Sequence, residues 1–65
     1  MNTLGDRIRY TRKNMKLTQQ AIADEFGIAR VSATQWENNI TAPDREKIVR
    51  LAALLKCTPD WLLSG

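Results

Sequence analysis

The stretch TQQAIADEFGIARVSATQWEN, residues 18–38, decides the fold of this chain. It predicts two short helices, over residues 19–26 and about 29–37, with Gly27 between them. A glycine directly after a helix supplies the positive φ angle that a C-cap needs. Both helices carry apolar side chains at helical spacing on the sides that would face each other: Ile22, Ala23, Phe26, Ala33 and Trp36. We therefore expect an angular pair of helices that holds the second one out for a nucleic-acid groove.

The helical spacing of apolar residues continues on both sides of this stretch and predicts five helices and no strand. The first helix is expected from about Thr3 to Asn14, with Leu4, Ile8, Thr11 and Met15 on one face. Thr18 should cap the second helix and Asp44 the fourth, which follows a loop over residues 40–43. Thr58 and Pro59 should start a short fifth helix that ends near residue 64. The predicted fold class is all-α, a compact five-helix bundle.

Size and composition limit the number of domains, the kind of partner and the compartment that we expect. Sixty-five residues with 43% hydrophobic side chains suit one small domain over residues 1–65 with a marginal core. The net charge of +3 weakly favours a polyanionic partner. No stretch is long and apolar enough to cross a membrane, and the start lacks the apolar segment of a secretory signal. One cysteine suits a reducing compartment, so we expect a cytoplasmic protein.

The absent residue types exclude several kinds of chemistry. With no histidine and a single cysteine, zinc fingers and most metal sites are not possible. Ser–His and Cys–His nucleophilic catalysis is also impossible within this chain. We expect a protein that is not an enzyme and that uses no cofactor and no metal.

The helix predicted over residues 29–37 has an unusual outward face. At 100° per residue, four side chains project away from the core: Arg30, Val31, Thr34 and Gln35. A solvated helix face is usually rich in paired charges, whereas this one combines a cation, an apolar group, a hydroxyl and an amide. Arginine can pair with guanine, glutamine with adenine, and the methyl groups of valine and threonine can meet thymine methyls. We predict that these four read bases; the alternative is a polar face without a partner.

Phosphate contacts are expected around this helix. Gln19 stands at the N-terminus of its helix, where free N–H groups and the helix dipole favour an anion. Ser32 lies off the outward face and can reach a flanking phosphate. The remaining candidates are Arg9, Lys13, Asn38 and Arg45. The alternative for each of the charged residues is an ordinary solvated surface.

Arg12 and Glu37 are predicted to form an inward ion pair. Arg12 borders the apolar face of the first helix, and Glu37 borders the core side of the third. Opposite charges at the edges of two packed faces should meet, and the pair would lock the two helices together. The alternative is two separate surface charges.

The chain resembles the DNA-binding domain of lambda-like phage repressors and Cro proteins over almost its whole length. The resemblance rests on three blocks, RIRYTRKNMKLTQQAIADEFGI, VSATQWENN and TPDWLLSG. It implies a five-helix helix-turn-helix fold and a transcriptional repressor that binds double-stranded operator DNA as a homodimer, weakly dimeric in solution. The operator would be near-palindromic, with half-site centres roughly 34 Å apart. It is also compatible with a domain that forms the N-terminal part of a longer repressor.

The resemblance also implies residue roles. Gln19 matches the family's phosphate-binding glutamine, which braces the recognition helix, and Arg12 and Glu37 match its buried bridge. Val31 resembles a valine that enters a cleft of thymine methyls. The family's dimer contact on the fifth helix corresponds to Pro59, Trp61 and Leu62.

Three departures from the family pattern stand out. Ala29 replaces the Ser or Thr that usually caps the third helix, so its start should be frayed. Asn39 replaces a frequent glycine. The segment Ile40-Thr41-Ala42 lacks basic residues, so we expect weaker binding and a shallower dependence on salt.

Other interpretations remain open at this point. Antitoxins and restriction-controller proteins share this fold. A protein-interaction module would instead use a surface of Leu4, Trp61, Leu62 and Leu63. Trp61 itself suits either the core or a dimer surface, whereas Cys57 is expected to be a small buried apolar residue.

Overall fold

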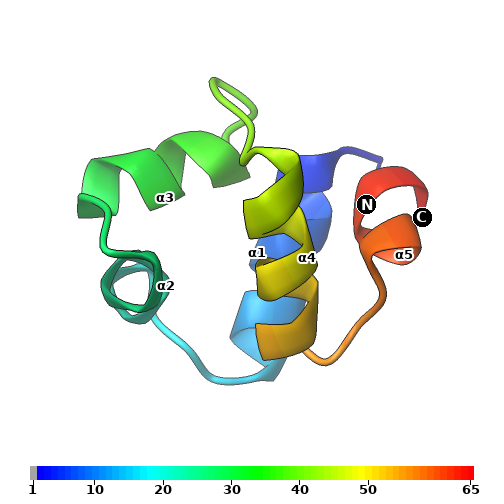
Figure 1. The fold of residues 1–65 in the computed structure, drawn as a ribbon, viewed down its shortest axis with the longest axis horizontal. Coiled ribbons are helices and arrows are strands. Elements are labelled where there is room, and N and C mark those ends of the chain that lie inside the picture. The colour runs from blue at the N-terminus through cyan, green and yellow to red at the C-terminus, as the bar shows by residue number, and fades with distance from the viewer. Residues whose placement is uncertain (1) are drawn as a thin grey trace.

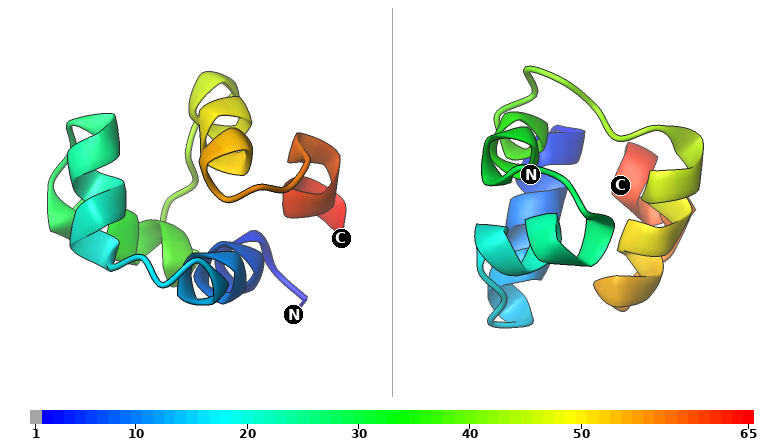
Figure 2. Two further views of the ribbon diagram at one scale, coloured as in Figure 1. Left: turned by 90° about the horizontal axis from the view of Figure 1, so that it is seen from below. Right: turned by 60° about the vertical axis from the view of Figure 1, so that its left-hand side comes forward.

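The computed structural model describes residues 2–65, and these form five α-helices and no strand. The helices are α1 (Leu4–Asn14), α2 (Gln19–Phe26), α3 (Arg30–Glu37), α4 (Arg45–Leu54) and α5 (Pro59–Ser64). Figure 1 shows α1 and α4 in the middle of the molecule, with α2 and α3 on one side and α5 on the other. The start of α1 lies beside α5, the last helix of the chain (Figure 2). The predicted all-α five-helix fold is confirmed.

Side-chain caps fix the start of four helices. The predicted caps Thr18, Asp44 and Thr58 each accept a hydrogen bond from the backbone N–H three residues later. Thr3 does the same for α1, so it is an N-cap and not, as predicted, the first residue of the helix. Ala29 forms no such bond at the start of α3, which begins one residue later than predicted.

The core lies where all five helices meet. Ile8, Ile22, Leu51 and Leu62 are the largest fully buried side chains. Trp36 is a core residue, as predicted, and its ring meets that of Phe26 edge-on at 5.7 Å between centroids. Among residues 2–65 no helix combines the length and the apolar character needed to span a bilayer.

Two apolar residues are less buried than the sequence indicated. The spacing places Met15 on the inward face of α1, but its side chain is 37% exposed because α1 ends at Asn14, the residue before it. Cys57 is only partly buried, and this burial raises the pKa of its thiol.

The N-terminus of α1 packs closely against the end of α3. Asn39 adopts a left-handed φ of 60°, and its Oδ1 accepts a hydrogen bond from the N–H of Gly5 at 3.0 Å. Its Nδ2 donates to the Thr3 hydroxyl, also at 3.0 Å. The asparagine therefore supplies both a backbone conformation that glycine would tolerate and a cap that glycine could not offer.

Arg7 holds α5 in place. It is 6% exposed, and its Nε and Nη2 donate to the carbonyls of Leu62 and Leu63, each at 2.7 Å. Carbonyls in the last turn of a helix have no partner within the helix, and a cation also suits this negative end of the helix dipole. One buried arginine of α1 thus caps the C-terminus of a helix that lies more than 50 residues away in the chain.

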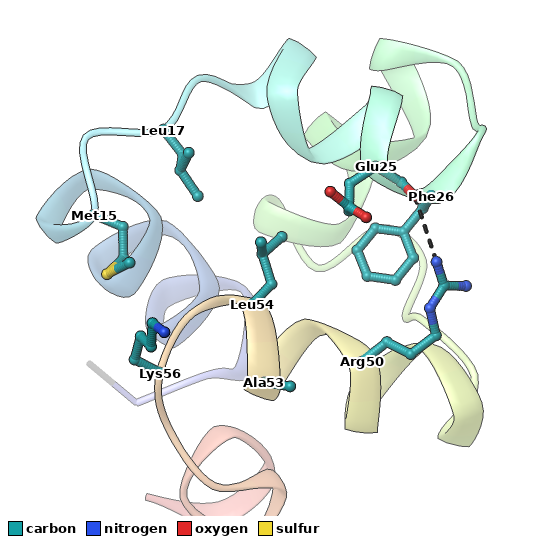
Figure 3. A pocket seen from close by; sticks show the side chains of 8 residues that line it. All are labelled: Met15, Leu17, Glu25, Phe26, Arg50, Ala53, Leu54 and Lys56. Carbon is teal, nitrogen blue, oxygen red and sulfur yellow. Dashed lines mark hydrogen bonds between the residues drawn. The ribbon is translucent and has the colours of Figure 1, made fainter.

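An arginine also links α4 to α2. The Arg50 guanidinium lies 4.6 Å from the centre of the Phe26 ring and donates to the carbonyl of Glu25 at 3.4 Å. Figure 3 shows this hydrogen bond beside a shallow groove, which is lined by residues of α2 and α4 and by Met15, Leu17 and Lys56 outside those helices. Because Phe26 precedes the turn into α3, Arg50 supports the base of the α2–α3 pair.

Candidate nucleic-acid interface

The turn between α2 and α3 sets the position of α3. Gly27 caps α2 in the left-handed conformation, with φ 63° and ψ 35°, as its place in the sequence predicted. The N–H of Ile28 then donates to the carbonyl of Ala23 at 3.0 Å. The chain turns sharply within three residues, so that α2 and α3 form an angular pair, and α3 lies at the periphery with one side packed on α2 and α1 (Figure 1).

The four candidate base-reading residues occupy the side of α3 that faces away from the core. Arg30 is exposed, and Val31 is 60% exposed. Thr34 and Gln35 are half-buried one turn later. On a regular helix these positions share one side, so α3 presents a cation, an apolar group, a hydroxyl and an amide together.

Glu37 at the end of α3 is the centre of the hydrogen-bond network behind that face. Glu37 is 2% exposed, and the predicted contact with Arg12 is present. The Nε of Arg12 donates to Oε2 of the carboxylate, and its Nη2 donates to Oε1 at 3.2 Å. Arg12 is itself 9% exposed and also donates to the carbonyl of Leu17 at 2.8 Å. The ion pair therefore ties α1 to both α3 and the start of the α2 segment.

Gln19 connects this buried charge to the outward face. Its Nε2 donates to Oε1 of Glu37 at 3.1 Å. Its Oε1 accepts from the hydroxyl of Thr34 at 2.8 Å, and that hydroxyl also lies 3.2 Å from the Arg30 carbonyl. One side chain of α2 thus bridges two residues of α3 and fixes the rotation of α3 about its axis.

The network keeps Glu37 ionised. Burial alone would raise the pKa of its carboxyl, but hydrogen bonds from Arg12, Gln19 and Arg9, together with the charge of Arg12, hold the pKa below the ordinary value of 4.5. A carboxylate that is both buried and charged needs such partners, since a buried charge without them is strongly destabilising.

The sequence suggested that Arg9 lies on a free basic surface, but the structure shows it bonded to the end of α3. Its Nε lies 3.3 Å from the Glu37 carboxylate, and its Nη2 donates to Oδ1 of Asn38 at 2.8 Å. The side chain remains 40% exposed at the edge of the network. Arg9 and Asn38 therefore form a pair at the C-terminus of α3, and both Asn38 and the open side of Arg9 face solvent.

The other phosphate candidates lie on different parts of the surface. Lys13 is exposed on α1. Ser32 and Gln35 line a shallow hollow beside α3 together with Lys47, which sequence reasoning did not single out. Arg45 lines a separate hollow between α4 and α5, and the structure does not bring it together with the Gln19–Thr34 cluster.

The dimer contact expected on α5 needs a correction. Leu62 is 0% exposed and belongs to the core, so it has no surface to offer a partner. Pro59 and Trp61 are partly buried. The exposed leucine is Leu63, at 51%, and it lines the hollow between α4 and α5 with Pro59 and Val49.

The sequence of this chain is similar to a helix-turn-helix family and to known regulators of transcription. The helix-turn-helix family model matches residues 8–62. The chain is 43% identical over 63 residues to the HTH-type transcriptional regulator DicA of Escherichia coli K12, covering 97% of this chain and 47% of that protein. It is 42% identical over 67 residues to repressor protein C2 of Salmonella phage P22, covering 100% of this chain and 31% of that protein. The chain therefore spans less than half the length of these two relatives.

Solved structures of the same phage repressor have a closely similar fold. A crystal structure of the P22 c2 repressor in complex with a synthetic operator superposes with a TM-score of 0.91 at 38% identity, covering 100% of this chain and 98% of that one. The solution structure of the P22 c2 DNA-binding domain gives a TM-score of 0.88 at 40% identity, covering 100% of this chain and 88% of that one. With the family model matching most of its residues, this chain belongs to the helix-turn-helix family.

Proposed function

We propose that this chain is the DNA-binding domain of a transcriptional repressor that reads a near-palindromic operator as a homodimer. The observation that carries the proposal is the outward face of α3, whose four mixed side chains are backed by the Gln19–Glu37–Arg12 network. Similarity to a repressor solved on a synthetic operator supports it. A helix held rigidly at the edge of a small domain is the part that can enter a major groove.

In this proposal α3 makes the base contacts. Arg30 pairs with guanine, Gln35 with adenine, and Val31 packs on thymine methyl groups. Gln19 contacts a phosphate with the N–H that its bond to Glu37 leaves over, because an amide nitrogen carries two hydrogens. Lys13, Ser32, Asn38 and the open side of Arg9 are further candidates for the DNA backbone, and Arg45 for a flanking phosphate.

Two subunits would lie in successive major grooves, with half-site centres roughly 34 Å apart. Pro59 and Trp61 of α5 would meet their counterparts, with the exposed Leu63 in place of the buried Leu62. Because the segment Ile40-Thr41-Ala42 brings no basic side chain, the salt dependence of binding should be shallow. The dimer of this domain alone should be weak.

The relatives are longer than this chain, so we propose that residues 1–65 form one DNA-binding domain of a longer regulator. Its site of action would be the cytoplasm of a bacterial host, where operator DNA lies. We propose no catalytic activity for it.

The experiment that tests the proposal compares Gln35→Ala with Lys13→Ala on a preferred duplex and on random DNA. Gln35→Ala should cost about 1–3 kcal/mol of binding free energy on the preferred duplex and little on random DNA. Lys13→Ala should weaken both duplexes alike, because a phosphate contact carries no sequence information. Equal losses for Gln35→Ala on the two DNAs would refute base reading, and tight binding to a protein partner with only weak DNA binding would favour an interaction module.

A further inference from the structure

We infer that the buried charge of Glu37 fixes the direction of hydrogen bonding at Thr34, so that the Thr34 hydroxyl can only accept from a base and selects adenine or cytosine at the one base, on one strand, that it faces. This inference rests on the proposed base-reading role of α3. It makes Thr34 a specificity-determining residue, and Gln19 and Glu37 positioning residues that act through it.

The first step is the orientation of the Gln19 amide. Glu37 is an ionised carboxylate held by Arg12 and Arg9, and a carboxylate can only accept hydrogen bonds. The amide of Gln19 must therefore turn its NH₂ group toward Glu37, where Nε2 lies 3.1 Å from Oε1 of the carboxylate. The opposite orientation would place two oxygens against each other in a buried site, which is strongly unfavourable.

The second step is the direction of the Thr34 hydroxyl. With its NH₂ group on Glu37, Gln19 presents its carbonyl oxygen to Thr34 at 2.8 Å. The second neighbour of the hydroxyl, the Arg30 carbonyl at 3.2 Å, is also an acceptor. A hydroxyl has one proton, and both neighbours demand it. Thr34 is therefore left with lone pairs and a methyl group for any ligand on the outward side.

This fixed polarity has a consequence in the major groove. The only hydrogen-bond donors that bases present there are the amino groups N6 of adenine and N4 of cytosine, whereas guanine and thymine present acceptors at O6, N7 and O4. A hydroxyl with a free proton would tolerate either kind of base. A hydroxyl whose proton is already used can hydrogen-bond only to an amino group, so the Thr34 hydroxyl gains a hydrogen bond from adenine or cytosine and none from guanine or thymine.

The test has two stages: selection of preferred duplexes, and then removal of a single amino group from the selected duplex. In the first stage, wild type, Thr34→Ser and Thr34→Val each select duplexes from a random pool, and thermal melting checks that each protein is folded. Thr34→Val keeps the shape of the side chain but not the hydroxyl, and Thr34→Ser keeps only the hydroxyl. At one position on one strand of the half-site, wild type and Thr34→Ser should prefer adenine or cytosine over guanine and thymine, and Thr34→Val should lose that preference.

In the second stage, the selected adenine is replaced by purine 2′-deoxyriboside, or the selected cytosine by the 2′-deoxyriboside of pyrimidin-2-one. Each replacement removes the amino group alone. Wild type should then bind about 3- to 10-fold more weakly, the range of one net hydrogen bond, while Thr34→Val should lose nothing beyond the cost common to all proteins. Equal losses in wild type and Thr34→Val would overturn the inference. So would a hydroxyl-dependent preference for guanine or thymine.

Gln19→Ala tests the relay itself. Removing the amide frees the Thr34 proton from its shorter bond and leaves it only the Arg30 carbonyl at 3.2 Å, so the preference for an amino base should relax in part, at this position only, on top of a uniform loss of affinity from the phosphate contact. An unchanged preference in Gln19→Ala would overturn the role of Gln19. These outcomes are distinct from failure of the proposed function, in which wild type itself would show no base preference at any position.

Discussion

The carbonyl oxygen of Glu37 lies directly against the α carbon of Gly5, so that a β carbon built at position 5 would come within 2.3 Å of it. The carbonyl of Trp36 is 2.7 Å from the same point. The N-terminal turn of α1 and the last turn of α3 therefore pack backbone against backbone. This close approach brings Arg9 and Arg12 of α1 within reach of the Glu37 carboxylate and places α3 relative to the rest of the domain.

Gly5→Ala should consequently destabilise the domain more than Gly27→Ala. The new methyl group at position 5 must push α1 away from α3, at about 3 kcal/mol, the upper range for overpacking. Nothing lies within 4 Å of a β carbon at Gly27, so that substitution costs only the left-handed backbone conformation, about 1–2 kcal/mol. Urea denaturation of both variants measures the difference. A Gly5→Ala protein as stable as Gly27→Ala would show that the two helices can separate freely.

Arg12→Ala should lower the free energy of unfolding by about 3–5 kcal/mol, because it leaves the Glu37 carboxylate buried without its main partner. Lys13→Ala is the matched control, since Lys13 neighbours Arg12 in the chain but is exposed. Thermal and urea melts at neutral pH provide the measurement. An unchanged melting temperature for Arg12→Ala would mean that the ion pair has no part in locking α1 to α3.

Stability should also depend on pH through Glu37. Its pKa is lowered in the folded protein relative to the ordinary value of 4.5, so the folded state binds this proton less readily than the unfolded state. The resulting stabilisation is present in full above about pH 5 and is lost as the pH falls through the lowered folded-state pKa. Because Glu37→Gln lacks the titrating group, the stability gap between wild type and this variant should be constant near neutral pH and shrink in acid. A gap that stays constant down to about pH 2.5 would contradict the assignment.

The sequence predicted the parts of this fold that depend on neighbours in the chain. Caps such as Thr18 and the glycine turn at Gly27 are local, and apolar spacing located all five helices. The same spacing missed that Thr3 is a cap, because periodicity marks a face and not its end. The dimer role of Leu62 came from the family resemblance, and the spacing could not correct it, because a helix of six residues is too short to separate buried from exposed positions by period alone.

Contacts of polar residues across the fold were only partly predictable. Arg12 was identified because it borders an apolar face and an opposite charge borders another. Arg7 borders that face on its other flank, which is a signal that would have identified it, but its partners are backbone carbonyls that have no sequence signature. The spacing of Arg9 predicts a surface charge, because nothing in that spacing shows that Asn38 lies opposite.

Arg7→Met tests this long-range closure. The substitution keeps much of the apolar stem but leaves the last carbonyls of α5 without their donor, so α5 should open locally before the rest of the domain unfolds. Hydrogen exchange should accelerate at the amide of Leu62, which bonds to the Thr58 carbonyl at 3.0 Å, and should change little at Ile22. Equal acceleration at both amides would indicate global destabilisation and not a hold on α5.

Selection of bound duplexes from a random DNA pool is the most direct measurement of whether α3 reads base edges. For the wild-type protein we predict an inverted repeat whose half-site centres lie roughly 34 Å apart, with thymines enriched beneath Val31. The variant Val31→Ala should lose the thymine enrichment at those steps and keep the preferences at the others. A wild-type pool with no preferred base at any position would contradict the account.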